Sequence, residues 1–361
     1  MAVVSQHTSK PAGIREIAAA LGVSIGTVDR ALHARSGVSA STRDRVREMA
    51  AKLNYSPNTA ARSLRLNRRS RIGVFLPRQI ALFFDPLRDG VRQAAESFTP
   101  GAVEVVFHTY PRIGEGEMEA LTAANWEQFD GVILAPGSPG LLPMLQRAHQ
   151  RKIPVVFVAS DFPRLPRLAS IAVDAMVSGG IAAELLGHKL AAPSTVAAFT
   201  GDLAIQDHAD KLRGFAATLA TLAPHLSLLP AVESHDRPAQ AYKAALDLFR
   251  RQPKIGGIYV STANGLPVLK AARELNLLGK VQIVCTDLSS GLLPMIERGF
   301  VFAALHQRPL TQGRMALDLL ARFLTAGTTP QEINRLAPHI VLRSNLSLFS
   351  GNISLDAGAS G

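Results

Sequence analysis

Polar and aromatic side chains follow the ends of several short apolar segments in this chain of 361 residues. Carboxylates and amides bind hydroxyl groups in pairs, and an aromatic ring covers the apolar face of a sugar. The pattern therefore predicts a binding site for a sugar or polyol, although each residue alone could instead cap a helix or solvate a loop. The candidate residues are Phe83 or Phe84 after IGVFL, Asp161 after VVFVAS, Asn264 after IYVSTA, Asp287 after VQIVCT and Gln307 after VFAALH.

Residues suited to catalysis or metal binding do not fall into productive patterns. Ser234, His235 and Asp236 are adjacent, so their side chains point in alternate directions in an extended chain and cannot form a relay. The first strand-to-helix turn, FLPRQIALFFDP, has no GxGxxG, no Walker loop occurs, and the acids of GEGEME would repel phosphate. The ten histidines include no HExxH spacing, and Cys285 lies in an apolar segment typical of a buried thiol. We expect no enzyme, no metal site, and no cofactor besides a small-molecule effector.

The elements that must position the candidate binding residues run from Ile72 to Phe349. Short apolar segments typical of strands alternate there with segments of helical periodicity, the first helix starting at about Pro86. This order predicts parallel sheets with right-handed crossovers and helices on both faces. About ten strands are too many for one small open sheet, so we expect an α/β region of two lobes.

Positive charge is concentrated before the α/β region. The net charge is +11, and residues 1–71 hold 13 Lys and Arg against 4 Asp and Glu. The segment SPNTAARSLRLNRRSR carries five arginines and no acid. This distribution predicts contact with nucleic acid phosphates, although a solvated charged surface is the simpler alternative.

The basic stretch also has the pattern of three short helices. Residues Ile14 to Leu21 place apolar side chains on one helical face, and Gly22 permits the turn that follows. Ser24 is a suitable N-cap for a second helix from about Ile25 to Leu32, and a third begins at Ser39 or Ser41 and runs to about Leu53. This is the pattern of an all-α helix-turn-helix head. The outward-facing residues of the second helix are Ile25, Gly26, Thr27, Asp29 and Arg30.

The stretch from Ile14 to Leu64 resembles the head of the lactose-repressor (LacI/GalR) family, through its blocks LGVSIGTVDRAL, VSASTRDRV and LNYSPNTAARSL. The resemblance implies a DNA-binding surface on the second helix, with Arg30 suited to a bidentate contact with guanine. It also implies a hinge helix over 57–64 whose wedge, Leu64, unstacks a base step. The DNA-binding residues so implied are Ser24, Ile25, Gly26, Thr27, Asp29 and Arg30 in the head, and Asn58, Ala61 and Leu64 in the hinge.

Two residues of the second helix depart from the family pattern. Asp29 stands where the family usually has Ser, and its carboxylate is repelled by phosphate, so it would accept from a cytosine amine or cap locally. Gly26 supplies no side chain for base contact and costs the helix about 1 kcal/mol relative to Ala. The operator sequence therefore cannot be inferred by analogy.

The region after Arg71 resembles the periplasmic-binding-protein-like sensor domain of the same family, with two Rossmann-like lobes. The resemblance implies an effector in the cleft between lobes, bound at Asp161, Asn264, Asp287 and Gln307, with Lys211 in place of a frequent arginine. We expect three crossings between lobes, near 161–166, 287–293 and 324–329. The expected domains are a head (1–56), a hinge (57–71), an N-lobe (72–162 and 290–325), a C-lobe (163–289 and 326–349) and a flexible tail (350–361).

These features together predict a cytoplasmic, nucleoid-associated homodimer on a near-palindromic DNA operator, regulated by its effector. The N-terminus lacks the apolar stretch of an export signal, and no apolar run is long enough for a membrane span. Two alternatives are a solute-binding transport protein, which would have an export signal and no head, and an architectural DNA binder that uses the head alone. Whether the effector releases or strengthens DNA binding stays open.

Overall fold

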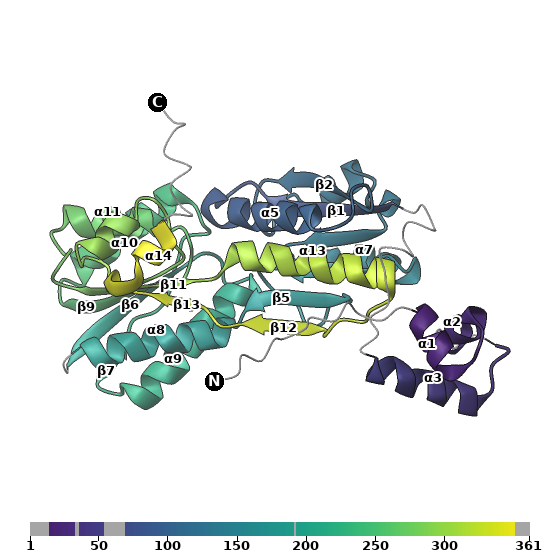
Figure 1. The fold of residues 1–361 in the computed structure, drawn as a ribbon. Helices are drawn as coiled ribbons and strands as arrows, with labels where there is room; N and C mark the ends of the chain where they lie inside the picture. Colours follow the sequence, from purple (N-terminus) through teal and green to yellow (C-terminus); the bar gives the residue numbers. More distant parts are fainter. Residues whose placement is uncertain (1–13, 33–35, 54–68, 191–192, 351–361) are drawn as a thin grey trace, which may run out of the picture. The chain divides into compact units, whose positions relative to one another are not determined.

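The computed structural model describes residues 14–32, 36–53, 69–190 and 193–350. The chain divides into two compact units, Met1–Arg68 and Arg69–Gly361, which we call the head and the body (Figure 1). The predicted fold class, an all-α head and a bilobal α/β body, is confirmed.

The head is a bundle of three short helices around one small apolar core. Ile17, Val28 and Val46 are fully buried, one from each helix. Gly22, with φ of 66°, makes the turn between the first two helices. Ser24 Oγ accepts from the Thr27 N–H at 3.0 Å, and Ser39, not Ser41, caps the third helix by accepting from the Thr42 N–H at 3.2 Å. The helices are α1 (Ile14–Leu21), α2 (Ile25–Leu32) and α3 (Ala40–Lys52).

The first lobe of the body, the N-lobe, has a six-stranded parallel sheet in the order β12-β5-β4-β3-β1-β2. Helices α5 and α13 cover one face, and α6, η1 and α7 pack on the other. The strands are β1 (Ser70–Pro77), β2 (Val103–Tyr110), β3 (Gly131–Leu134), β4 (Val155–Val158), β5 (Ala169–Val173) and β12 (Ile333–Leu336). The helices are α5 (Ala81–Glu96), α6 (Glu117–Ala123), η1 (Trp126–Gln128), η2 (Pro139–Leu141), α7 (Leu142–Gln150) and α13 (Pro309–Ala326).

The second lobe, the C-lobe, repeats this plan in the order β13-β11-β10-β9-β6-β7, with β8 beside β6 and only β13 antiparallel. Helices α8 and α9 cover one face, and α10, α11 and α12 the other. The strands are β6 (Ser194–Thr200), β7 (Leu226–Leu228), β8 (Val232–Glu233), β9 (Ile255–Val260), β10 (Gln282–Thr286), β11 (Ala303–His306) and β13 (His339–Val341). The helices are α8 (Ala175–Lys189), α9 (Gln206–Leu222), α10 (Pro238–Arg251), α11 (Leu266–Glu274), α12 (Leu293–Glu297), η3 (Arg343–Asn345) and α14 (Ser347–Ser350).

The expected lobe boundaries are wrong, because each crossing lies roughly 7 to 19 residues further along the chain. Strands β5 and β12 pair within the N-lobe sheet, and β11 pairs within the C-lobe sheet. The chain therefore crosses after Val173, after His306 and after Leu336. Asp161 and Asp287 follow strands β4 and β10, after which the chain stays within its lobe.

Helix α5 begins at Ala81 rather than at the expected Pro86, which lies in its second turn. The proline has no N–H, so the carbonyl of Leu82 lacks the usual helical donor there. Four short strands, β7, β8, β12 and β13, were not predicted. They have two to four residues each and are largely exposed or half-buried, so they lack the apolar run used to recognise the others.

Each lobe has one close crossing of two helices through glycines. In the N-lobe, a methyl group on Gly313 of α13 would overlap the backbone of Leu87 in α5, and one on Gly90 would overlap Leu310. In the C-lobe, Gly179 of α8 lies equally close to the backbone of α9. Because glycine has no side chain, the backbones of the paired helices touch at these points. The contacts fix the positions of the helices that lead into the space between the lobes.

Glu117, in the first turn of α6, is a buried acid in the N-lobe. Its Oε1 accepts from the Gly114 N–H at 2.7 Å. Burial opposes ionisation and raises the pKa of Glu117 to about 7. The folded state therefore holds a proton on this carboxyl at pH values where the unfolded chain has lost it.

Gly313→Ala should lower the free energy of unfolding of the body by about 1 to 3 kcal/mol, because the methyl group meets backbone that cannot rotate away. Chemical denaturation followed by circular dichroism measures this change. Gly265→Ala is the control, since its new methyl group has only ordinary van der Waals contacts within the body. A fully stable Gly313→Ala body would show that the two helices can separate without cost.

Glu117→Gln should reduce the pH dependence of stability. Folding raises the pKa of Glu117 in the wild-type protein. The free energy of unfolding of the wild type therefore falls as pH rises from about 4.5 to about 7, and this residue contributes up to roughly 3 kcal/mol to the fall. Thermal unfolding measures this effect. The melting temperature of the variant relative to that of the wild type should be higher at pH 8 than at pH 5. The same difference in melting temperature at both pH values would contradict a raised pKa for Glu117.

Candidate functional site

Helix α2 presents one exposed surface of the head. Ile25 is 50% exposed, an unusual position for a large apolar side chain, and Gly26 and Arg30 are also exposed. Thr27 and Asp29 are half-buried, and Ser24 Oγ lies 2.9 Å from Thr27 Oγ1. The structure thus brings the six predicted head residues onto one short helix and its cap. Asn58, Ala61 and Leu64 lie outside the described residues.

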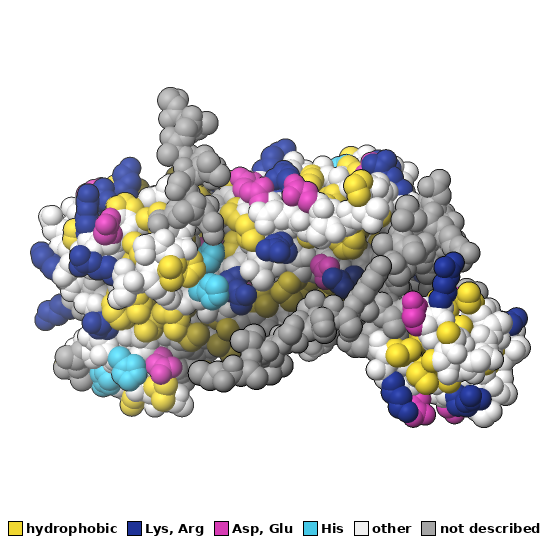
Figure 2. Space-filling view, viewed as in Figure 1, with side chains coloured by type: hydrophobic (Ala, Val, Ile, Leu, Met, Phe, Trp, Pro, Cys, Tyr) yellow, Lys and Arg dark blue, Asp and Glu magenta, His cyan; other side chains and the backbone are white. Residues whose placement is uncertain are grey.

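The other two helices of the head also carry exposed basic side chains. Arg15, Arg45 and Arg47 are exposed together with Arg30. The Glu48 carboxylate is paired instead with Lys52 at 2.8 Å, which lowers the pKa of Glu48. On the body, Lys and Arg are spread among acidic groups over the visible face (Figure 2). The exposed arginines of the head therefore suit a polyanion such as the DNA backbone.

A cleft of about 600 Å³ lies between the two lobes of the body. Residues that follow the carboxyl ends of strands from both sheets line it, as expected for open α/β sheets. Its polar lining is mixed in charge and suits a neutral ligand with several hydrogen-bonding groups. The polar groups are Gln79, Arg112, Glu115, Ser138, Asp202, His208, His235, Asp236, Arg237 and Gln240.

One hydrogen bond joins the lobes across the cleft. Gln79 Nε2, after β1, donates to the main-chain oxygen of Asp236, after β8. Asp236 is itself held by Thr262, whose Oγ1 donates to Asp236 Oδ1 at 2.5 Å. Both His235 and Asp236 have positive φ values, 47° and 51°, which aim this turn into the cleft.

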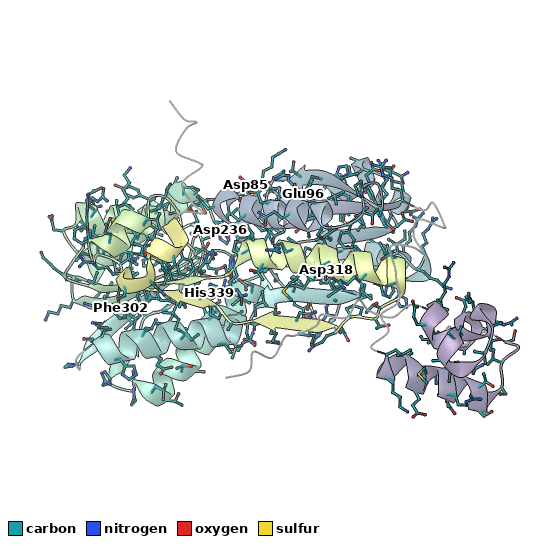
Figure 3. The ribbon with its side chains drawn as sticks, viewed as in Figure 1. Asp85, Glu96, Asp236, Phe302, Asp318 and His339 are labelled. Atoms are coloured by element: carbon teal, nitrogen blue, oxygen red, sulfur yellow. The ribbon has the colours of Figure 1, made fainter. Side chains whose placement is uncertain are left out.

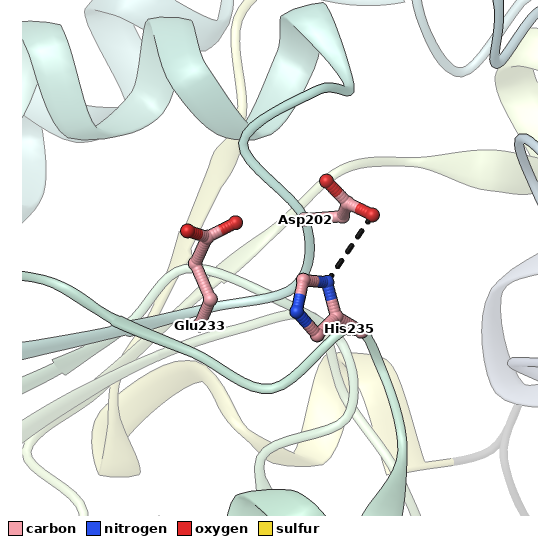
Figure 4. Close-up of side chains that lie close together, drawn as sticks. All are labelled: Asp202, Glu233 and His235. Carbon is pink, nitrogen blue, oxygen red and sulfur yellow. Dashed lines mark hydrogen bonds and ion pairs between the residues drawn. The ribbon is translucent and has the colours of Figure 1, made fainter.

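Asp202, Glu233 and His235 lie together at the C-lobe side of the cleft (Figure 4). Their possible metal-ligand atoms are all within 4.8 Å of one another. Each side chain already has a partner, because Asp202 Oδ2 is 3.3 Å from His235 Nδ1 and Glu233 accepts from the Leu203 N–H. The trio could offer a cation three ligands, which sequence spacing did not indicate because they come from two separate strand ends.

Three of the predicted effector residues form a buried hydrogen-bond network. Lys211 is 1% exposed, and its Nζ donates to Asp207 at 2.6 Å and to Gln307 Oε1 at 2.8 Å. Gln307 donates to both carboxylate oxygens of Asp287, at 2.8 and 2.5 Å. This network lies where the chain leaves β11 for α13, and a buried charge there must be paired. Asp207 was not predicted.

The network continues into the N-lobe. Gln312 of α13 is fully buried, and its Nε2 donates to the Gln307 carbonyl at 2.8 Å. Gln312 Oε1 accepts from the Ala159 N–H, after β4, at 3.0 Å. Hydrogen bonds therefore run without interruption from α9 in the C-lobe to β4 in the N-lobe.

The other predicted effector residues are dispersed. Phe83 and Phe84 are both buried in the N-lobe core, and only Phe84 also lines the cleft. Asp161 pairs with Arg167 at 2.7 Å beside a smaller cavity of about 70 Å³. The Asn264 N–H donates to Thr262 Oγ1 at 3.2 Å. None of the ten cleft-lining polar residues was predicted as an effector contact, although they lie in the segments that follow strand ends.

Two side chains considered as possible nucleophiles, Ser234 and Cys285, have structural environments. Ser234 Oγ donates to the Thr200 carbonyl at 2.8 Å rather than contacting His235. Cys285 is buried, as predicted, and burial raises the pKa of its thiol to about 12. In the described part of the chain no helix has the length and apolar character needed to cross a membrane.

Comparison with known proteins supports the division into head and body. Residues 13–58 match the family "Bacterial regulatory proteins, lacI family", and residues 72–329 match "Periplasmic binding protein domain". Catabolite control protein A of Priestia megaterium is 24% identical over 92% of this chain and 98% of its own length. The ribose operon repressor of Bacillus subtilis is 28% identical over 78% and 84%.

Solved structures share the fold of the body. The glucose-galactose binding protein GanP of Geobacillus stearothermophilus superposes with a TM-score of 0.71 at 21% identity, covering 77% of this chain and 99% of its own. A solute binding protein of Burkholderia graminis in complex with D-arabinose gives 0.71 at 23% identity, over 77% and 96%. The resemblance inferred from the sequence blocks is confirmed, and the chain belongs to the lacI family of bacterial regulatory proteins, with a periplasmic binding protein domain as its body.

Proposed function

We propose that this protein is a sequence-specific transcriptional repressor whose affinity for a DNA operator is controlled by a sugar or polyol bound between the lobes. The observation that carries the proposal is the α2 surface, where Ile25, Gly26 and Arg30 are exposed on a basic three-helix head. Such a helix fits the major groove, and the exposed arginines fit the flanking phosphates.

We further propose a homodimer on a near-palindromic operator. A single head of three short helices covers only one half-site, and a two-fold pair reads two. The hinge over 57–71 would bring Asn58, Ala61 and Leu64 to the minor groove, as the family resemblance implies. The protein would act in the cytoplasm, on the nucleoid.

The cleft supports a sugar or polyol as the effector. Its walls combine amide, hydroxyl, imidazole and carboxylate groups with the Phe84 ring, which suits paired hydroxyls and an apolar sugar face. Two relatives are named after a sugar operon or regulon, namely the ribose operon repressor of Bacillus subtilis and the maltose regulon regulatory protein MalI of Escherichia coli. Asp161, Lys211, Asn264, Asp287 and Gln307 remain proposed effector contacts, reached when the lobes shift.

The network around Lys211 links the two lobes of the body, so a change in how the lobes meet must pass through it. A ligand that changes how the lobes meet must rearrange the bonds of Gln307 and Gln312, which lie at a crossing. In a dimer, each of the two lobe arrangements would place the two hinges differently. The effector would then change the fraction of dimers that can bind DNA. We propose no catalysis and no cofactor.

A solute-binding transport protein is the second candidate, because the body shares its fold with such proteins. The matched head at 13–58 favours the regulator.

Arg30→Ala should weaken binding to a duplex selected with the wild-type protein by about 5- to 150-fold, the value of one bidentate base contact. Fluorescence anisotropy at fixed salt measures the affinity. Arg251→Ala, an exposed arginine of the C-lobe, is the charge-matched control and should bind normally. An operator affinity as high in Arg30→Ala as in the control would remove Arg30 from the reading surface.

Lys211→Met should destabilise the body by about 3 to 5 kcal/mol, because it leaves the Asp207 carboxylate and Gln307 without their buried cation. Denaturant unfolding measures this loss. Lys243→Met, at an exposed position of α10, should change stability by less than about 0.5 kcal/mol. If both variants were equally stable, the network would not hold the lobes.

A further inference from the structure

His208 in the C-lobe wall of the cleft has one defined tautomer. It lies in the first turn of α9 and is 8% exposed. The Asp202 backbone N–H points at its Nδ1, with 3.0 Å between the nitrogens. A backbone nitrogen keeps its hydrogen, so Nδ1 must be the unprotonated ring atom, and its 3.2 Å approach to the Asp202 carbonyl is no hydrogen bond. The proton of the neutral ring therefore lies on Nε2.

Asp236 faces this proton from the next loop. It is 7% exposed and lies at the end of the C-lobe that faces the N-lobe (Figure 3). Thr262 occupies Oδ1, and Gln79 from the other lobe occupies the main-chain oxygen. Asp236 Oδ2 lies 4.0 Å from His208 Nε2, which is too long for a hydrogen bond. Both side chains line the cleft.

The backbone of Gly201 lies next to both the His208 and the Asp236 side chains. A methyl group on Gly201, at the end of β6, would overlap both the His208 ring and Asp236 Oδ2. The Gly201 backbone therefore lies directly against both groups. A buried donor and a buried acceptor thus lie close together in the wall of the cleft, too far apart to bond each other directly.

We propose that His208 Nε2 and Asp236 Oδ2 clamp a single hydroxyl group of the effector. An oxygen about 2.8 Å from each atom fits a 4.0 Å gap, accepts from Nε2–H and donates to Oδ2. An ether, a fluorine or a carboxylate cannot do both, because none supplies a proton to Oδ2. This inference rests on the proposed binding of a sugar or polyol in the cleft, and it adds that one unmodified hydroxyl of that compound is obligatory.

The test begins with a panel of monosaccharides and polyols, screened by thermal shift on the full chain. Calorimetry then compares the compound that binds with each of its monodeoxy derivatives. One derivative should bind the wild type about 30- to 100-fold more weakly, because removing its hydroxyl leaves two buried groups unsatisfied.

Two variants identify the clamp. His208→Asn keeps an acceptor for the Asp202 N–H and removes the Nε2 donor, whereas Asp236→Asn keeps an oxygen for Thr262 and replaces the free acceptor by a donor. In each variant the parent compound and that deoxy derivative should bind within about threefold of each other. His188→Asn, at an exposed position of α8, should retain the full difference.

The outcomes separate this inference from the proposed function. If a sugar binds but the deoxy penalty persists in His208→Asn and Asp236→Asn, the clamp is wrong and the effector class stands. If no sugar or polyol binds the wild type, both fail. Circular dichroism and thermal unfolding of the ligand-free variants check that they are folded.

Discussion

The body depends on the buried Lys211 cation. Lys211 lies at 1% exposure where the two sheets face each other, and a charge there is tolerable only with partners on every side. Asp207 supplies the opposite charge, and Gln307 links it to Asp287, to Gln312 and so to β4 of the other lobe. Because each of these bonds has one favourable arrangement, the lobes meet in a defined way, and a ligand that competes for any of them changes that arrangement.

Close helix crossings fix the positions of the helices that carry the network residues. α9 carries both Lys211 and His208, and its backbone is pinned to α8 at Gly179 and Gly214. α13 carries Gln312, and Gly313 pins it to α5. Small displacements of the lobes therefore move the polar groups of the cleft and of the crossing together, since neither helix can slide alone.

The sequence predicted those elements that depend on one residue or on one local pattern. The caps at Ser24 and Ser39, the apolar stripe through Ile17 and Val28, and the parallel strands could all be predicted, because each follows from one residue or one period. It misplaced the lobe crossings, since whether β5 or β11 pairs with one sheet or the other is decided by contacts far along the chain. The cleft was found only in part for the same reason. Asp202, His208 and Asp236 meet through the pairing of β6 with β8, and no spacing in the sequence indicates it.

The most direct measurement is the operator affinity of the full chain with and without a saturating concentration of the sugar or polyol that stabilises it, at constant salt. Effector control through the cleft predicts a change of at least about fivefold, in either direction. An operator affinity unchanged by a compound that demonstrably occupies the cleft would contradict the coupling between the body and the DNA-reading head.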